Sequence, residues 1–365
     1  MRIQPVIFER YPGLAGKIPW LSLGEFPTPI QKLEKLGAEL GLDQLYCKRD
    51  DLSHPEYGGN KVRKLEFLLA EAKLLNRKSV LTIGAWGSNH ILATTVLAKK
   101  LGIQPIAVMI PQCGQEYARK NLLANFTLGC ELHFARGTLF AGWKITQVYL
   151  RHWRRGHRPY FIWAGGSSRL GALGYVNAGL EIAQQVKENL LPEPDYVFCA
   201  VGSCGTLAGL ALGLKLAGLK TRVIGIRVYH KTVANSSQSL RLGRKAISLI
   251  RKFEPAIPNL TLSLSDFPVQ HNYAGTGYAV CSQAGLEAVR MAKDLEGLEL
   301  ETTYTGKSLS GLIDLARKGG LNNKVVIFLN SFNSRPLEKL APAFPAWQEL
   351  PEEFHHCFEE KRPRE

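Results

Sequence analysis

A lysine directly behind two glycines is the residue of this sequence with the clearest potential for chemistry. Lys61 follows Gly58, Gly59 and Asn60 and opens a segment whose apolar residues recur at helical spacing, at Leu65, Leu68, Leu69 and Ala72. At about 100° per residue, Lys61 falls near the middle of this apolar stripe, whereas Arg63 points about 160° away from it. Burial lowers the pKa of an amine, and a lysine with a lowered pKa can form a Schiff base with an aldehyde. The alternative is a lysine that extends past the helix end to water.

A glycine-containing loop in the middle of the chain has the features of a phosphate site. Gly202, Ser203, Cys204, Gly205 and Thr206 join an apolar strand pattern to a helical pattern. Glycines let backbone N–H groups converge, and a helix N-terminus adds partial positive charge. The loop lacks the spacing of dinucleotide and nucleoside triphosphate motifs, so it favours a compact phosphate monoester. A tight turn that binds no ligand would have a similar sequence.

A second loop of this kind, Gly84–His90, also lies between a strand pattern and a helical pattern. Ser88 and Asn89, together with backbone N–H groups, could hold a substrate carboxylate or a cofactor oxygen. Ser88 could equally be a simple helix N-cap, and His90 alone is typical of a hydrogen-bonded structural histidine.

Two tyrosines stand near flexible glycines in the last third of the chain. Tyr278 ends the run Tyr273-Ala274-Gly275-Thr276-Gly277-Tyr278, and Tyr304 opens Tyr304-Thr305-Gly306-Lys307. Each tyrosine also has an ordinary explanation as a half-buried amphipathic ring.

Composition indicates a globular protein with a basic surface. The chain has 365 residues, of which 45% are hydrophobic, enough for two ordinary domains or one large one. The net charge of +15 is spread over small clusters, with no long basic arm and no motif that reads bases. We therefore expect a solvated surface that suits an anionic cofactor and substrate, rather than a nucleic-acid-binding protein.

Cysteine usage and hydropathy bear on the compartment. The seven cysteines are odd in number and include no C-x-x-C pair, which indicates reduced thiols in a cytoplasmic protein without a zinc site or other metal site. Early charges and prolines argue against a signal peptide. Tyr196–Leu214 carries no charge, but a turn sequence interrupts it, so we expect a buried strand, a loop and a buried helix rather than a membrane span.

Strand patterns alternate with helical patterns along most of the chain. The expected strands are Leu45–Lys48, Ser79–Gly84, Pro105–Ile110, Glu131–Ala135, Tyr196–Val201, Val223–Val228 and Lys324–Leu329. The expected helices are Lys61–Leu75, Asn89–Leu101, Ala118–Leu128, Leu173–Glu188, Thr206–Ala217, Gly285–Lys293 and Ser310–Arg317. This alternation predicts an α/β fold with mainly parallel sheets, which bind ligands at the carboxyl ends of their strands.

Two breaks in composition, the Gly58-Gly59 turn and the run Gly165-Gly166-Ser167-Ser168, suggest where domains meet. They predict a small domain of residues 64–166, inserted in a large domain made of residues 1–63 and 167–345. Residues 346–365 are rich in Glu, His, Lys and Pro and are expected to form a peripheral tail.

Together and in this order, the segments resemble the pyridoxal-phosphate-dependent family that contains 1-aminocyclopropane-1-carboxylate deaminase and D-cysteine desulfhydrase. This family is a branch of the fold-type II enzymes, which are similar to tryptophan synthase β and have two domains. The similarity lies in Phe26–Ile30, Lys48–Asp51, Gly58–Glu66, Gly87–His90, Leu170–Ala178, Gly202–Thr206 and Tyr304–Lys307.

The resemblance implies a role for each matching residue. Lys61 would carry pyridoxal 5′-phosphate as a Schiff base and, once released, would move protons. Gly202–Thr206 would hold the cofactor phosphate, and Asn89 would meet the ring hydroxyl. Ser88, Asn89 and His90 would frame the substrate carboxylate.

The resemblance also implies which of the two namesake activities is favoured. Tyr278 and Tyr304 match the family's active-site tyrosines, and Thr305 would face the pyridine nitrogen of the cofactor. The deaminase branch has a glutamate directly after the tyrosine, and a carboxylate at the pyridine nitrogen deepens the electron sink. The neutral hydroxyl of Thr305 makes a weaker sink, sufficient for β-elimination of a good leaving group, so it favours the desulfhydrase.

The sequence departs from the family near its last core strand. Asn330-Ser331-Phe332-Asn333 stands where the family has a glycine-containing run. Ser331 keeps the hydroxyl of the desulfhydrase type, whereas Phe332 and Asn333 replace small residues. A reshaped substrate pocket is therefore expected.

The interpretation that unites these observations is a pyridoxal-phosphate-dependent lyase that carries out α,β-elimination on a small amino acid of the D-cysteine kind. It would release a 2-oxo acid, ammonia and sulfide. Deamination of aminocyclopropane-carboxylate and sulfo-lyase action on cysteate are the alternatives within enzymes. The other classes are a cofactor-holding protein that has lost turnover and, more remotely, a nucleic-acid binder. The resemblance implies a homodimer, and the charge and hydropathy patterns above lead us to expect neither nucleic acid nor a membrane as a partner.

Overall fold

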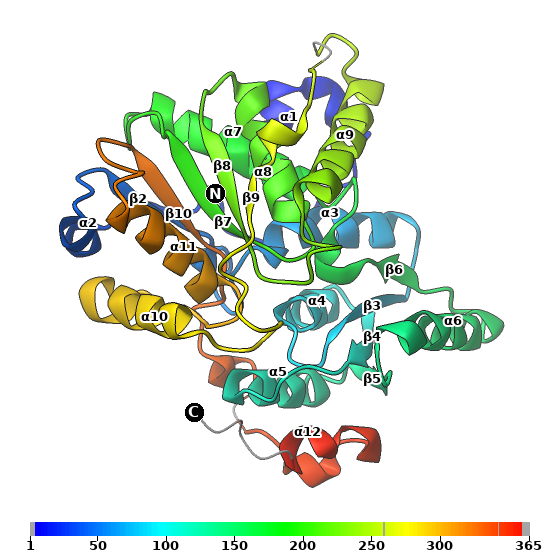
Figure 1. Cartoon of the computed structure of the whole chain (residues 1–365). Coiled ribbons are helices and arrows are strands. Elements are labelled where there is room, and N and C mark those ends of the chain that lie inside the picture. Colours follow the sequence, from blue (N-terminus) through cyan, green and yellow to red (C-terminus); the bar gives the residue numbers. More distant parts are fainter. Residues whose placement is uncertain (1–3, 258–259, 342, 360–365) are drawn as a thin grey trace.

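The computed structural model describes residues 4–257, 260–341 and 343–359, and its strands form two sheets (Figure 1). The larger sheet has six strands in the order β1-β2-β10-β7-β8-β9. All neighbours in it are parallel except β1, which pairs antiparallel with β2. Its strands are β1 (Ile30–Lys32), β2 (Leu45–Arg49), β7 (Tyr196–Val201), β8 (Arg222–Arg227), β9 (Val269–Gln270) and β10 (Val326–Asn330).

The smaller sheet is parallel throughout and has four strands in the order β5-β4-β3-β6. Its strands are β3 (Ser79–Ala85), β4 (Gln104–Ile110), β5 (Glu131–Phe134) and β6 (Tyr160–Ile162). They all come from the stretch of chain between β2 and β7, so the smaller sheet is an insertion between two strands of the larger one.

Helices cover both faces of each sheet. On the larger sheet, α2, α10 and α11 pack on one face, and α1, α7, α8 and α9 lie over the other (Figure 1). On the smaller sheet, α4 and α5 oppose α6. The helices are α1 (Val6–Arg10), α2 (Glu34–Leu40), α3 (Lys61–Leu74), α4 (Asn89–Lys100), α5 (Glu116–Thr127), α6 (Thr138–Arg154), α7 (Leu173–Lys187), α8 (Gly205–Ala217), α9 (Ser236–Phe253), α10 (Gln283–Glu296), α11 (Thr305–Arg317) and α12 (His356–Glu359).

The predicted α/β architecture with two mainly parallel sheets is confirmed. The uncharged stretch Tyr196–Leu214 is β7, a loop and most of α8, as its turn sequence predicted. None of the helices in the described part of the chain has both the length and the apolar content that crossing a bilayer requires. The exact domain boundaries stay a prediction, and α3 crosses the one expected between residues 63 and 64.

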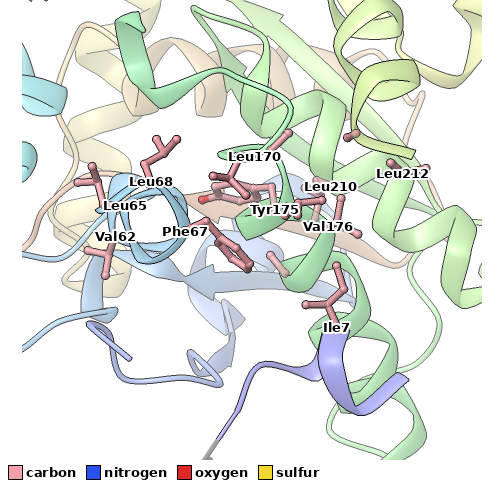
Figure 2. Close-up of a cluster of buried hydrophobic side chains, with 14 of the residues drawn as sticks. Ile7, Val62, Leu65, Phe67, Leu68, Leu170, Tyr175, Val176, Leu210 and Leu212 are labelled. Carbon is pink, nitrogen blue, oxygen red and sulfur yellow. The ribbon is translucent and has the colours of Figure 1, made fainter. Parts of the chain in front are cut away.

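Helix α3 connects the two sheets and is buried over most of its circumference. It packs on α7 of the larger sheet and on α4 of the smaller one. Figure 2 shows Phe67 of α3 on the side of Tyr175 and other apolar side chains of α7 and α8, with Val62 and Leu65 on the opposite side of the helix. Each such side chain contributes about 1.5–3 kcal/mol through burial, so α3 is a fixed platform rather than a surface helix.

The helical spacing puts Arg63 on the side of α3 away from Lys61, and the structure buries that side of the helix as well. Arg63 is only 1% exposed, because carboxylates meet it on the far side of the helix. Its guanidinium binds Asp50 at 2.7 Å and Glu181 at 2.9 Å. Lys48 binds the same Glu181, so two cations and two anions form a buried neutral cluster. The Tyr175 hydroxyl completes it by donating to Asp50 at 2.6 Å.

The segment after residue 345, predicted to form a peripheral tail, packs on the rest of the protein through a few apolar residues. Leu350, Phe354 and Cys357 are buried and join Trp86 in the apolar core over α4 and α5. The Glu353 carboxylate accepts a hydrogen bond from the Phe134 backbone N–H at 2.9 Å, on the edge strand β5. Spaced apolar residues thus anchor a segment that is polar on average, and its description as a peripheral tail stays a prediction. Of the predicted tail, residues 360–365 lie outside the described residues.

Candidate active site

A cavity of about 220 Å³ lies at the carboxyl ends of both sheets. Its wall includes the loops after β3 and β7 and the first residues of α3, α4 and α8. Open parallel sheets bind their ligands in such loops. The cavity brings together nearly all of the residues predicted from the sequence, namely Lys61, Ser88, Asn89, His90, Gly202, Ser203, Cys204, Gly205, Thr206, Tyr278 and Tyr304.

Lys61 is the first residue of α3, and its side chain lines the cavity. The turn before it needs glycine, since Gly59 has a φ of +98° and a Cβ there would lie 2.9 Å from the Ser331 carbonyl oxygen. The Lys61 amine donates a hydrogen bond to Asn60 Oδ1 at 2.7 Å. Burial lowers the pKa of Lys61 to about 8, although the charge of Glu301 acts in the opposite direction. A larger fraction of the amine is therefore neutral and able to condense with an aldehyde.

The loop between β7 and α8 forms a small polar pocket at a helix N-terminus. Gly205 and Thr206 open α8, where backbone N–H groups lack partners within the helix. Cys204 adopts a left-handed φ of +65°, which turns the chain sharply into the helix. Ser167 supports the turn: its Oγ accepts from the Gly205 N–H at 3.2 Å and lies 2.7 Å from Ser203 Oγ. A side chain at Gly205 would collide with Ser167, so this close approach requires glycine.

Lys64 lies one helical turn beyond Lys61 and lines the same cavity. It is 1% exposed, and its ammonium group donates to the Gly165 carbonyl oxygen at 3.2 Å. A Cβ on Gly205 would lie 3.0 Å from Lys64 Nζ, which puts this amine beside the start of α8. Burial, and then the charge of Lys61, lower the pKa of Lys64 well below its usual value. A buried amine that donates to a carbonyl oxygen, next to a helix N-terminus, is suited to a phosphate dianion.

The start of α4 forms the opposite wall. Ser88 is the helix N-cap, and its side chain accepts from the His90 backbone N–H at 3.2 Å. Asn89 Oδ1 accepts from Asn121 at 2.8 Å, which fixes the orientation of the amide. His90 Nε2 lies 3.0 Å from the Thr82 hydroxyl, and burial lowers the pKa of His90 well below its usual value. The imidazole is thus neutral and held by β3, while Ser88 and Asn89 present polar groups to the cavity.

Two tyrosines from different segments meet at the cavity wall. The hydroxyl oxygens of Tyr278 and Tyr304 lie 2.5 Å apart, and the ring of Tyr229 packs edge-on against Tyr278 with centroids 4.9 Å apart. Burial raises the pKa of both Tyr278 and Tyr304 well above the ordinary value for a phenol. The pair is therefore neutral at physiological pH and can donate a proton into the cavity.

Thr305, predicted to face the pyridine nitrogen of the cofactor, keeps that role only as a prediction. It is buried outside the cavity wall, and its hydroxyl is engaged by Glu301, donating to the backbone carbonyl at 3.2 Å. The residue after Tyr304 is the first residue of α11, so its side chain turns away with the helix. The cavity instead meets Ser331, Phe332 and Glu301.

Glu301 is a carboxylate in the cavity wall that the sequence did not single out. It accepts hydrogen bonds from the backbone N–H groups of Thr303 at 2.7 Å and of Tyr304 and Thr305 at 2.8 Å. Burial raises the pKa of Glu301, and these three donors act against that rise. Glu301 thus caps the start of α11 and lies close enough to Lys61 to favour its charged form.

The donor set fits pyridoxal phosphate. Lys61 offers an amine for the aldehyde, and the α8 N-terminus with Lys64 offers cationic and N–H groups for the phosphate. Ser331 and Glu301 are cavity-lining groups that could face the ring nitrogen. Apolar and aromatic side chains make up much of the remaining wall, as a planar ring requires.

A model of the family of pyridoxal-phosphate dependent enzymes matches residues 21–331, so this chain belongs to that family, and its cofactor is pyridoxal phosphate. The match spans both sheets and ends at Ser331 in the cavity wall.

Individual proteins similar to this chain indicate which group of the family it resembles. A putative 1-aminocyclopropane-1-carboxylate deaminase of Pyrococcus furiosus is 35% identical over 317 residues, covering 86% of this chain and 92% of its own. A D-cysteine desulfhydrase of Salmonella newport is 35% identical over 321 residues, covering 86% and 94%. The crystal structure of an ACC deaminase homologue superposes with a TM-score of 0.77 at 34% identity, covering 91% and 96%. A threonine deaminase from T.th., at 20% identity and a TM-score of 0.59, covers 91% and 98% and shares the fold.

Sequence reasoning missed three residues of the site: Lys64, Ser167 and Glu301. Lys64 carried a usable signal, because a residue three positions after Lys61 lies on nearly the same side of a helix. Ser167 belongs to the run Gly165-Gly166-Ser167-Ser168, which was interpreted only as a domain boundary. The sequence around Glu301 gave no indication of a role in the site. Glu301 precedes α11, and its place in the cavity wall depends on how that helix packs in the folded protein.

Proposed function

We propose that this protein is a deaminating β-lyase for a small, neutral amino acid of the D-cysteine kind. For D-cysteine, the amino acid and one water give pyruvate, hydrogen sulfide and ammonia. Both the C–S bond and the C–N bond break, and no external oxidant or reductant takes part. The proposal rests on the relatives named D-cysteine desulfhydrase and on the chemistry of the cavity wall.

One observation carries the choice of substrate class. Within the described cavity wall, the charged side chains are Lys61, Lys64 and Glu301. In this proposal Lys61 holds the aldehyde and Lys64 the phosphate, so no cation is left for a negatively charged substituent. A sulfonate would be buried without a partner, which costs at least about 2–7 kcal/mol. The cavity therefore favours a neutral thiol over cysteate.

Different residues of this chain have different roles in the proposed reaction. When bound, the cofactor supplies an electron sink for the carbon next to the substrate amine. Lys61, once released from the aldehyde, removes the proton from that carbon. Tyr278 and Tyr304, held neutral by burial, donate a proton to the departing sulfur. Ser88 and Asn89 orient the substrate carboxylate at the start of α4.

Ser331 is proposed as the partner of the ring nitrogen in place of Thr305. It lines the cavity beside the Lys61 turn, and its carbonyl oxygen accepts from the Asn60 N–H at 3.1 Å. A neutral hydroxyl makes a moderate electron sink, adequate for losing a thiolate. If Glu301 faced the ring nitrogen instead, its carboxylate would favour the more difficult opening of a cyclopropane ring. Aminocyclopropane-carboxylate deaminase is therefore the second candidate activity.

The test is a product assay on the purified, cofactor-loaded protein. D-cysteine, L-cysteine, aminocyclopropane-carboxylate and cysteate are assayed for sulfide, 2-oxo acids and sulfite. Sulfide and pyruvate from D-cysteine, absent in Lys61→Ala, are the expected result. Release of 2-oxobutyrate or sulfite as the dominant product would reassign the activity. A cofactor absorbance band that no amino acid changes would indicate a protein that has lost turnover.

Two further features remain predictions. The resemblance implies a homodimer, and the seven cysteines without a disulfide framework imply a cytoplasmic location. Neither bears on the reaction proposed above.

A further inference from the structure

Helix α5 of the smaller sheet contacts residues from two opposite walls of the active-site cavity. It packs beside α4 (Figure 1), and its Asn121 amide donates hydrogen bonds to the Gly87 carbonyl oxygen at 3.0 Å and to Asn89 Oδ1 at 2.8 Å. These two acceptors belong to the loop at the start of α4, where the substrate carboxylate is proposed to bind. The first residues of α5 contact the two segments that carry Tyr278 and Tyr304.

Gln115 immediately precedes α5, and its side chain binds the segment that follows Tyr278. Gln115 is in the N-cap position, but its amide does not cap the helix. Its Nε2 donates to the Ala279 carbonyl oxygen and, at 3.2 Å, to Cys281 Sγ. Its Oε1 accepts from the Thr302 hydroxyl at 3.2 Å. Both hydrogens of the amide nitrogen and the amide oxygen therefore join the smaller sheet to the segments that carry the tyrosines.

Ala279 has a backbone conformation that needs support from its surroundings. Its φ is +59°, in the left-handed region that residues other than glycine rarely adopt. Ala279 is fully buried and directly follows Tyr278. The hydrogen bond from Gln115 to the Ala279 carbonyl oxygen holds the chain at this point. It therefore helps to fix the direction in which the Tyr278 side chain leaves the backbone.

Tyr117, in the first turn of α5, makes the second contact. Its hydroxyl oxygen lies 2.6 Å from Oγ1 of Thr303, the residue before Tyr304. Thr303 is fully buried, and its backbone N–H donates to Glu301 at 2.7 Å. Burial, and then the neighbouring Tyr278 and Tyr117, raise the pKa of Tyr304 well above its ordinary value, so Tyr117 lies close to the tyrosine pair.

We propose that Gln115 and Tyr117 are positioning residues that hold the Tyr278–Tyr304 pair where it protonates the departing sulfur. This role rests on the proposed β-elimination, in which the pair is the acid. Neither Gln115 nor Tyr117 lines the described part of the cavity wall, so each acts through the tyrosines. Because α5 also contacts the carboxylate loop, the helix sets the position of the proton donors relative to the bound substrate.

The first test compares two leaving groups on the cofactor-loaded protein. A thiolate leaves more readily when it receives a proton, whereas chloride, the anion of a strong acid, needs none. Tyr117→Phe should lower kcat for D-cysteine about 10-fold and change kcat for β-chloro-D-alanine by less than about twofold. Tyr149→Phe is the matched control, because it removes a tyrosine hydroxyl that accepts from Arg158 on the remote helix α6, and it should change neither value. Equal losses with both substrates would overturn the positioning role.

A second variant of α5 separates carboxylate binding from proton donation. Asn121→Leu removes both hydrogen bonds to the loop at the start of α4, so it should raise KM about fivefold with little change in kcat. Tyr117→Phe should leave KM within about twofold of the original value. A rise in KM as large as that of Asn121→Leu would show that loss of the Tyr117 hydroxyl moves the whole helix, which would contradict a separate role for Tyr117.

A double-mutant cycle tests the contact itself. Tyr117→Phe and Thr303→Val each remove one partner of the same hydrogen bond. If the tyrosine pair is held through this bond, the double variant should lose no more kcat for D-cysteine than the more impaired single variant. Losses that multiply would show that the two side chains act independently and would overturn the contact as the cause.

Hydrogen exchange followed by mass spectrometry tests the positioning without any reaction. In the cofactor-loaded protein, Gln115→Ala should speed amide exchange about 10-fold in the peptides that carry Tyr278 and Tyr304, and leave the peptides of α3 unchanged. Unchanged exchange around both tyrosines would overturn the proposal, whichever amino acid is the substrate. A different main product in the product assay would overturn the proposed function without altering this exchange result, so the two proposals fail or stand separately.

Discussion

Two neighbouring residues of α3, Arg63 and Lys64, show two ways in which this protein treats a buried cation. Both are 1% exposed. Arg63 is matched by Asp50 and Glu181 in a neutral cluster that joins β2, α3 and α7. Lys64 donates to the Gly165 carbonyl oxygen rather than to a carboxylate, and burial lowers its pKa well below the usual value.

The charged residues on the two sides of α3 therefore have different roles. On the side of Arg63, the charges satisfy one another, and the cluster fixes the helix in place. On the side of Lys61 and Lys64, the amines lie in a cavity and their charge is incompletely compensated by the protein. That deficit is a cost in the empty protein and a source of affinity for an anionic ligand.

Removing Arg63 should give the largest effect on stability. Arg63→Met leaves Asp50 and Glu181 buried with one cation fewer, which we expect to lower the free energy of unfolding by about 3–5 kcal/mol. Urea denaturation followed by circular dichroism measures it. Lys73→Ala, at an exposed position of the same helix, is the control and should change the value by less than about 0.5 kcal/mol. Equal effects from the two variants would refute the contrast.

Lys64→Met should act on the cofactor rather than on the fold. We expect pyridoxal phosphate to bind about 10–100-fold more weakly, because one charged hydrogen bond to the phosphate is lost. The cofactor-free protein should be as stable as the original or more stable, since an uncompensated buried amine is removed. Fluorescence titration and thermal unfolding without cofactor measure the two quantities. A large loss of stability without cofactor would place Lys64 with Arg63 as a structural cation.

The smallest expected effect is a change in the free energy of unfolding with pH. The pKa of Lys61 is about 8 in the folded chain, against an ordinary value of 10.5. Between these values the unfolded chain binds more protons, so the destabilising effect of Lys61 on the cofactor-free protein should fade as pH rises from 8 to 10.5. The difference in unfolding free energy between the original protein and Lys61→Met, measured over this range, isolates the contribution. A difference that is constant with pH would contradict the lowered pKa.

Much of the fold could be predicted from the sequence, because strand–loop–helix order is a local signal. The loops at Gly84–His90 and Gly202–Thr206 were expected at strand ends, and the structure brings both to one cavity. Helix α6 was missed, since its apolar residues lie on the outer face and its basic end was interpreted as a surface cluster. The anchoring of Leu350, Phe354 and Cys357 depends on contacts with α4 and α5 that no local pattern reveals.

Single residues of the site could likewise be predicted from the sequence only where the signal was local. Lys61 could be singled out because a glycine turn and helical spacing coincide within a few residues. The resemblance implied that Thr305 faces the pyridine nitrogen, and this stays a prediction. Tyr304 lines the cavity, whereas Thr305, the first residue of α11, does not. Ser331 and Glu301 line the cavity because of tertiary packing, which cannot be predicted from the spacing of residues along the chain.

We propose that the Lys61 amine, and not that of Lys64, holds the cofactor. Both amines line the cavity, and burial lowers the pKa of each. Borohydride reduction of the cofactor-loaded protein, followed by proteolysis and mass spectrometry, identifies the modified lysine. We expect the label on Lys61 alone. A label on Lys64, or on any lysine outside the cavity, would contradict it.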